Sequence, residues 1–476
     1  MRVPILRFTV RRMMVAVSVL ALGQATAAGG GGPGNARLGR AVAEADRLDP
    51  GWKIKDIEAT RVRPAAGKDS AEVLGSTKGR LSSPTSAEIE ALNTTLVADP
   101  GRRLDAAAKR ELTAFIGRNR AVLPALRSLA DRPTGRFASQ AGKNYLAIPL
   151  PHLQTLRDQV RLLLADALLS VDGGDADGAL VRCRAALCAA RSLLDEPLAI
   201  SQFTRIACDA STQQAVLLVL ARGRPSDAAL SKTQQLLADE ADQPMTQIAL
   251  RGERAMMFET LGHLADGSLT LGEVTATTDP LKKYPDLLKK YPDAFPDSLV
   301  RSGLFHTSRG IMLEQMTGLV EVVRKPSWTW REGVERFERT IRSGPDVDPK
   351  RNPEELIPRA LMPSASPLIR ALIRGELRTD ALGRSLVLLI AARRHYLNRR
   401  QWPASAEALV PKHLTAVPPD PLTGKPMRLV KKGDRLIAYS LGVDGRDDGG
   451  EVSGSSRQDV EKSADVGFEL STNRAR

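Results

Sequence analysis

Aromatic residues are scarce in this chain, at 4% of its 476 residues. Strands of a β-sandwich favour aromatic and β-branched side chains, whereas a core of leucine and alanine with few large rings suits packed helices. The length is sufficient for two or three domains, each with its own core. The composition therefore predicts a mainly α-helical protein.

Cysteine and histidine are also rare. The three cysteines, Cys183, Cys188 and Cys208, form no CxxC motif, and their odd number argues against a disulfide framework or a structural zinc site. We expect them to be small buried side chains within helices. The five histidines show neither metal-ligand spacing nor an HExxH motif, and GxSxG and P-loop motifs are missing. No catalytic constellation is recognised, and the chain is not expected to be an enzyme.

Long apolar runs are missing outside the N-terminus. There, four arginines within the first twelve residues precede an apolar segment at 13–23, and small residues follow at 24–28. A membrane-spanning helix needs about twenty apolar residues. The pattern therefore favours a cleaved signal peptide over residues 1–28, with an uncleaved anchor in the inner membrane as the alternative. We expect an exported protein of the periplasm or cell envelope.

The net charge of +14 is concentrated in two places, the N-terminus and residues 378–435, where twelve Lys and Arg face four acidic residues. Because the rest is nearly balanced and few aromatics are available for base stacking, no nucleic-acid partner is expected. The basic stretch is either a solvated surface or a contact for an anionic partner such as lipid head groups or an acidic polysaccharide. The cations considered for that contact are Arg393, Arg394, Arg399, Arg400, Lys431 and Lys432.

Helical periodicity is clearest in the middle of the chain. Apolar residues recur mostly at three- and four-residue spacing over 156–171 and 180–194, separated by two glycines, and Asp175 is expected to cap the second helix. A strict 34-residue repeat is missing, so the pattern predicts an array of helical hairpins rather than a tetratricopeptide domain. Further helices are expected over residues 37–47, 86–97, 104–129 (broken or kinked at Pro124), 197–222, 227–240 (capped by Ser226), 244–266 and 298–342.

Three segments are expected to lack regular structure. Residues 62–85 are polar and contain glycine, serine and proline, which predicts a loop. A tandem Leu-Lys-Lys-Tyr-Pro-Asp repeat within 278–297 is interpreted as a duplication in a surface loop, with a basic docking loop as the alternative. Residues 343–367 are rich in proline, which predicts a linker before the C-terminal part.

The last hundred residues carry an ordered set of motifs. A helix over 382–400 is followed by Trp-Pro, by a Pro-Asp-Pro turn at 419–421, by a hairpin over 427–438 and by Tyr-Ser-Leu-Gly-Val-Asp-Gly at 439–445. Ala-Asp-Val at 464–466 comes last. This order resembles the periplasmic half of the major pseudopilin of type II secretion systems, over roughly residues 379–468. The resemblance implies a small α+β module at the C-terminus.

An acidic loop follows the hairpin. Asp444, Asp447, Asp448 and Glu451 fall within eight residues that include three glycines. Calcium takes six to eight oxygen ligands from flexible loops, so the segment is either a calcium loop or a solvated turn. In the pseudopilin family the corresponding loop binds calcium. The resemblance implies Asp444 and Asp465 as ligands, with Asp448 as a further candidate.

Two departures limit the resemblance. The prepilin signature and its apolar stalk are missing, so polymerisation into a pseudopilus is not expected. The rest of the chain, including Ala45–Trp52 and Asp195–Gln202, looks like a family of exported bacterial helical proteins, from which no activity follows.

The expected protein is mainly α, a helical-hairpin array followed by the small α+β pseudopilin-like module. Its expected role is that of a non-catalytic binding or scaffold protein of the cell envelope with protein partners. An accessory of a type II secretion or pilus-like system and an envelope hydrolase with an unrecognised site are the alternatives. The expected parts are a signal peptide or anchor (1–28), a linker with short helices (29–100), a helical domain (101–342), a Pro-rich linker (343–377), the module (378–470) and a tail (471–476).

Overall fold

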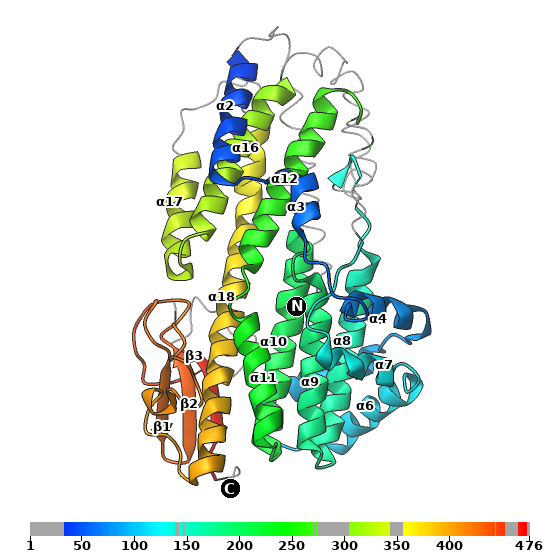
Figure 1. Ribbon diagram of the computed structural model, residues 1–476, viewed down its shortest axis with the longest axis vertical. Coiled ribbons are helices and arrows are strands. Elements are labelled where there is room, and N and C mark those ends of the chain that lie inside the picture. Colours follow the sequence, from blue (N-terminus) through cyan, green and yellow to red (C-terminus); the bar gives the residue numbers. More distant parts are fainter. Residues whose placement is uncertain are drawn as a thin grey trace.

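The computed structural model describes residues 33–138, 142–145, 148–270, 273, 304–342, 356–442, 444–452 and 465–473. The expected signal peptide and the tandem repeat lie outside the described residues. The described part is mainly helical with one small antiparallel sheet near the C-terminus (Figure 1), which confirms the predicted mainly α class.

The middle of the chain folds into the expected series of helices. Asp175 and Ser226 begin two of them, as predicted, since their side chains accept hydrogen bonds from the backbone N–H groups of Gly178 and Ala229. The periodicity and caps are local signals, which is why the sequence located these helices to within a few residues. They are α8 (Pro151–Asp172), α9 (Ala176–Ala190), α10 (Ala199–Arg222), α11 (Asp227–Glu240) and α12 (Met245–Ala265).

Before α8 the structure corrects two predictions. Part of the expected loop at 62–85 is helical, because Asp69 caps a helix whose Leu74 packs into the core. The helix expected over 104–129 is divided at Asn119, whose side-chain amide bonds to the backbone of Ser82 and Phe115. The elements are α2 (Pro33–Leu48), α3 (Ile54–Thr60), α4 (Ser70–Thr77), η1 (Lys78–Arg80), α5 (Ser86–Leu96), α6 (Ala106–Arg118), α7 (Leu123–Arg127) and η2 (Ser128–Asp131).

After α12 the described chain resumes with α16 (Leu304–Val323), η6 (Ser327–Thr329), α17 (Trp330–Arg342) and α18 (Leu356–Arg399). The linker predicted over 343–377 is therefore wrong from residue 356 onward. Proline inside a helix costs about 3 kcal/mol, which is why the prolines of this segment predicted a linker. Ile369, Ile373 and Leu377 form a buried apolar stripe, so packing against neighbouring helices stabilises α18 despite its prolines.

The C-terminal sheet has the order β1-β2-β3 and is antiparallel throughout. Its strands are β1 (Arg428–Lys432), β2 (Arg435–Ser440) and β3 (Val466–Ser471). A short 3-10 turn, η8 (Glu407–Leu409), precedes them. The sheet packs on the C-terminal half of α18 (Figure 1), so the helix and hairpin expected from the sequence are present in the expected order.

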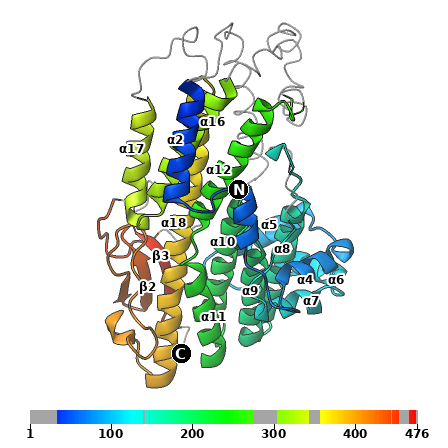
Figure 2. The same ribbon diagram turned by 45° about the horizontal axis from the view of Figure 1, so that its top comes forward.

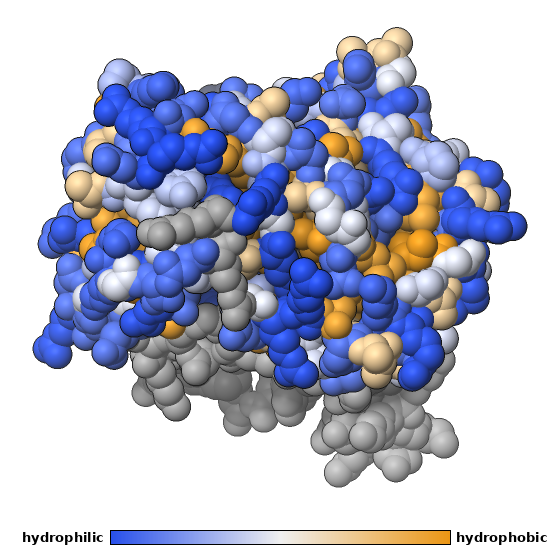
Figure 3. Space-filling view, turned by 90° about the horizontal axis from the view of Figure 1, so that it is seen from below, coloured by the Kyte–Doolittle hydropathy of each residue, from blue (hydrophilic) through white to orange (hydrophobic). Residues whose placement is uncertain are grey.

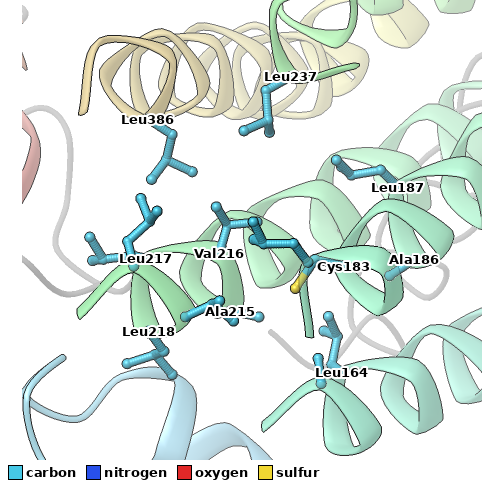
Figure 4. Packing of buried hydrophobic residues seen from close by; sticks show 14 of the residues in the cluster. Leu164, Cys183, Ala186, Leu187, Ala215, Val216, Leu217, Leu218, Leu237 and Leu386 are labelled. Atoms are coloured by element: carbon cyan, nitrogen blue, oxygen red, sulfur yellow. The ribbon is translucent and has the colours of Figure 1, made fainter. Parts of the chain in front are cut away.

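One hydrophobic core extends from the helical array into the sheet. Figure 4 shows Val216 and Leu217 of α10 facing Leu237 of α11 and Leu386 of α18, with Cys183 of α9 beside them. The same cluster includes Leu436 of β2, Phe468 of β3 and their neighbours. The C-terminal segment therefore shares its core with the array. Along α18, the buried apolar residues up to Leu377 belong to separate clusters, and those from Ala381 onward belong to this one.

Helix α18 connects the two ends of the molecule. Figures 1 and 2 show it passing from the group formed by α2, α16 and α17 down to the sheet and α11. Within the described residues no helix is both long and apolar enough to cross a membrane. From below, the surface is mostly hydrophilic, with apolar patches between hydrophilic residues (Figure 3).

All three cysteines are buried and unbridged, as predicted. Burial raises the pKa of each thiol to about 12. Their packing within the helical core is that of small apolar side chains.

Candidate functional site

The Pro-Asp-Pro turn is organised by Asp420, which is 1% exposed. Its carboxylate accepts hydrogen bonds from Leu422 N at 2.8 Å and Thr423 Oγ1 at 2.9 Å within the turn. It also accepts from Ser440 Oγ at 2.7 Å and Leu441 N at 3.0 Å at the end of β2. This buried carboxylate fixes the turn against the strand that leads into the acidic loop.

Asp465 lies at the other end of the acidic loop, at the start of β3, and is fully buried. Its Oδ2 accepts a hydrogen bond from Gly450 N at 2.7 Å, whereas its Oδ1 has no hydrogen-bond partner among the described residues. Burial and the nearby charges of Asp447 and Asp448 raise the pKa of this carboxyl to about 6. A buried carboxylate oxygen without a protein partner is the kind of atom that a cation can coordinate.

The other acids of the loop are exposed. Asp444 Oδ1 accepts a hydrogen bond from Arg446 N at 3.0 Å, and Asp447 Oδ1 accepts from Tyr439 Oη at 2.9 Å. In the described part of the chain no three His, Cys, Asp or Glu side chains gather as a metal-holding group. Of the expected ligands, Asp465 is thus buried with one unpartnered oxygen, whereas Asp444 and Asp448 are exposed, and calcium binding by these residues stays a prediction. Residues 453–464 of the loop lie outside the described residues.

The basic stretch is not a uniform surface. Arg393 is buried, and its guanidinium lies about 6 Å from the ring centres of Tyr396 and Trp402. Arg394 pairs with Asp227 of α11, with Nε and Oδ1 at 2.9 Å. These two arginines stabilise the packing of α18. The remaining cations considered for an anionic contact are exposed: Arg399, Arg400, Lys431 and Lys432.

The segment Asp195–Gln202 proves to be a buried polar junction. Glu196 accepts hydrogen bonds from Ser201 Oγ at 2.7 Å, and its Oε1 lies 3.0 Å from His152 Nε2. Ser201 thus donates to a glutamate that separates it from the histidine, which is not the nucleophile-to-base arrangement of a hydrolase. Asp195 accepts from Arg61 Nε at 3.1 Å and so ties the N-terminal part to the array.

The segment Ala45–Trp52 forms a second junction. The buried carboxylate of Asp49 accepts from Arg251 Nε at 2.8 Å and also binds Arg254 and Arg324. The Trp52 ring is buried and lies 5.5 Å from the guanidinium of Arg254. These contacts fasten the end of α2 to α12 and α16.

A cluster of ionisable groups lies inside the array. Glu240 of α11 accepts hydrogen bonds from Arg191 Nη1 at 2.7 Å and Arg205 Nε at 2.8 Å. Although burial opposes ionisation, these arginines hold the pKa of Glu240 below its usual value. Asp209 of α10 is fully buried, and desolvation together with the Glu240 charge raises its pKa well above the ordinary range. Asp209 therefore favours its protonated form more than an ordinary aspartate does, and Glu240 favours its ionised form.

Two further acids of this cluster come from α18. Glu376 Oε2 accepts a hydrogen bond from Thr246 N, at the start of α12, at 2.5 Å. Burial raises the pKa of Glu376 to about 7, and burial and the Glu376 charge raise that of Asp380. Sequence reasoning missed these acids, although they continue the three- and four-residue spacing of Ile369 and Ile373. This spacing predicts that the two acids lie on the same face of the helix as Ile369 and Ile373, and it was the sequence signal that could have identified them.

No protein-family model, curated protein or solved structure matches this chain. The likeness of residues 379–468 to the major pseudopilin therefore stays a prediction.

Proposed function

We propose that the protein is an exported, non-catalytic binding or scaffold protein of the cell envelope. The observation that supports this best is the continuity of α18, which packs on the helical array, on α17 and on the sheet. A single long helix shared by all three parts holds their surfaces in a fixed relation, which is what a scaffold requires.

The buried polar junctions support the same role. The ion pair of Arg61 with Asp195 joins residues 134 positions apart, and that of Arg324 with Asp49 joins residues 275 positions apart. Breaking a buried ion pair by removing one partner costs about 3–5 kcal/mol. These buried ion pairs join segments that are distant in the sequence, and they therefore stabilise a rigid surface for partners.

A calcium ion in the acidic loop is part of this proposal. Asp465 would supply its buried Oδ1, with Asp444 and Asp448 as the further ligands. The ion would replace the proton that the raised pKa of about 6 favours on Asp465. Calcium binding should therefore weaken as the pH falls through this value, and its structural effect would be to fix the loop between β2 and β3.

Thermal unfolding of the full chain with calcium and with chelator tests this part. A calcium concentration a hundred times Kd stabilises the folded state by about 2.7 kcal/mol. We expect a higher Tm with calcium, lost in an Asp444→Asn/Asp448→Asn variant, whose exposed positions leave the fold intact. Asp131→Asn, an exposed acid in η2, is the matched control. An unchanged Tm in the unsubstituted protein would contradict the calcium site.

In-cell photocrosslinking tests the scaffold role. Photoreactive residues at the exposed positions 399 and 431 should crosslink the same envelope protein, and the buried position 393 should not. The helix-on-sheet order of the C-terminal part favours a second candidate, an accessory of a type II secretion system. In that case the crosslinked protein would be a secretion component. A chain recovered in the cytoplasm would contradict both.

A further inference from the structure

A pocket of about 230 Å³ opens between η6, α17, α18 and the turn that follows Asp420. The turn is held there by Ser327, whose Oγ donates a hydrogen bond to Pro421 O at 2.9 Å. Trp328 lies directly on Gly424, where an added Cβ would come within 2.8 Å of the indole. The pocket thus forms where the upper helices meet the C-terminal segment.

The pocket has an apolar bottom and a cationic opening. Val334, Ile373 and Leu377 are buried, and the half-buried Leu422 completes the apolar lining. The charged lining lies at the opening, where three arginines, one of them half-buried, stand against one exposed glutamate, and Trp328 is 45% exposed beside them. The charged residues are Arg331, Arg370, Arg374 and Glu332.

Two of the three arginines already bind carboxylates within the chain. Arg370 Nε donates to Glu338 Oε1 at 2.9 Å, and Arg331 Nε lies 3.4 Å from Glu335 Oε1. Glu332, the one acid of the lining, pairs with Arg336 at 2.5 Å, which offsets its charge. A carboxylate at the opening would share Arg331 and Arg370 with Glu335 and Glu338, whose pairs already orient these guanidinium groups for carboxylates.

We propose that this pocket binds a medium-chain alkyl carboxylate, with the alkyl chain against the apolar bottom and the carboxylate at the arginines. Pockets for drug-sized ligands measure about 300–1,000 Å³. This smaller volume suits one short chain rather than a long lipid. The inference does not depend on the acidic loop or on the scaffold role.

Isothermal titration of the full chain with octanoate tests the inference, with octanol and octylamine as uncharged and cationic analogues of the same chain length. We expect octanoate to bind at least tenfold more tightly than either analogue. Arg331→Gln/Arg374→Gln, two exposed positions, should weaken octanoate at least tenfold and change octanol binding less than twofold. The matched control, Arg399→Gln/Lys431→Gln, should change neither.

A second variant tests the location. In Leu422→Phe, the larger side chain at this half-buried position should fill the pocket. We expect the variant to bind neither octanoate nor octanol, while its far-UV circular dichroism spectrum stays unchanged. Equal binding of the three compounds, or octanoate binding that survives both variants, would overturn the proposal. Absence of octanoate binding to the unsubstituted protein would do so as well.

Discussion

Glu376 gives the most informative stability prediction. It is 2% exposed on α18, where desolvation raises its pKa from 4.5 to about 7, against the opposing hydrogen bond from Thr246 and the charge of Arg205. The folded protein therefore holds this proton up to about pH 7, whereas the unfolded chain releases it near pH 4.5. Over that interval the folded state binds more protons than the unfolded state. The free energy of unfolding therefore falls as the pH rises and levels off above about pH 7.

The size of the effect follows from the two pKa values. Each pKa unit corresponds to about 1.4 kcal/mol, so ionising Glu376 in the folded protein costs about 3 kcal/mol between pH 4.5 and about 7. Glu376→Gln removes the titration, and the amide oxygen still accepts the hydrogen bond from Thr246 N. We expect the variant to gain about 3 kcal/mol relative to the unsubstituted protein across this interval.

Urea unfolding followed by far-UV circular dichroism, repeated across the interval, measures this difference. Taking the difference between the two proteins at each pH cancels most of the titration that they share. Glu90→Gln, at an exposed position of α5, is the control for replacing a glutamate. A difference between Glu376→Gln and the unsubstituted protein that stays constant with pH, or that shrinks as the pH rises, would refute the reasoning.

Four further predictions concern packing and reactivity. Asp420→Asn should lower the free energy of unfolding by about 3 kcal/mol, because an amide cannot accept all four hydrogen bonds; a loss under about 1 kcal/mol in denaturant unfolding would contradict this. Gly252→Ala should destabilise by about 1–3 kcal/mol or more, since its Cβ would lie 1.8 Å from Pro197 O. In the same assay Gly117→Ala, in α6 with open space around it, should stabilise by about 0.5–1 kcal/mol. A thiol reagent should react only after unfolding, and prompt reaction in the native protein would conflict with the burial of Cys183, Cys188 and Cys208.

The shared core also decides how the C-terminal part can be studied. Leu386 and Leu389 of α18 are buried in the same cluster as Val216 of α10 and as the sheet. A fragment containing only the end of α18 and the sheet would expose this apolar surface to water. Experiments on the acidic loop therefore need the full chain.

The sequence by itself determined the local structure. The helices from α8 to α12, the caps at Asp175 and Ser226, and the buried cysteines followed from apolar periodicity and from side chains that bond their own backbone neighbours. Such signals act over a few residues, so they can be recognised in the sequence without knowledge of the rest of the fold. The order of helix, turn and hairpin near the C-terminus was accessible for the same reason.

Only the tertiary structure decided which polar residues are buried. Asp420 and Glu376 have the appearance of ordinary turn and helix acids, yet each loses its water because segments distant in sequence cover it. Distant segments also decide the structure from residue 356 onward, where the chain is helical because the apolar stripe of α18 packs against α16 and α17. Desolvation and packing depend on neighbours far along the chain, and a local pattern contains no information about them.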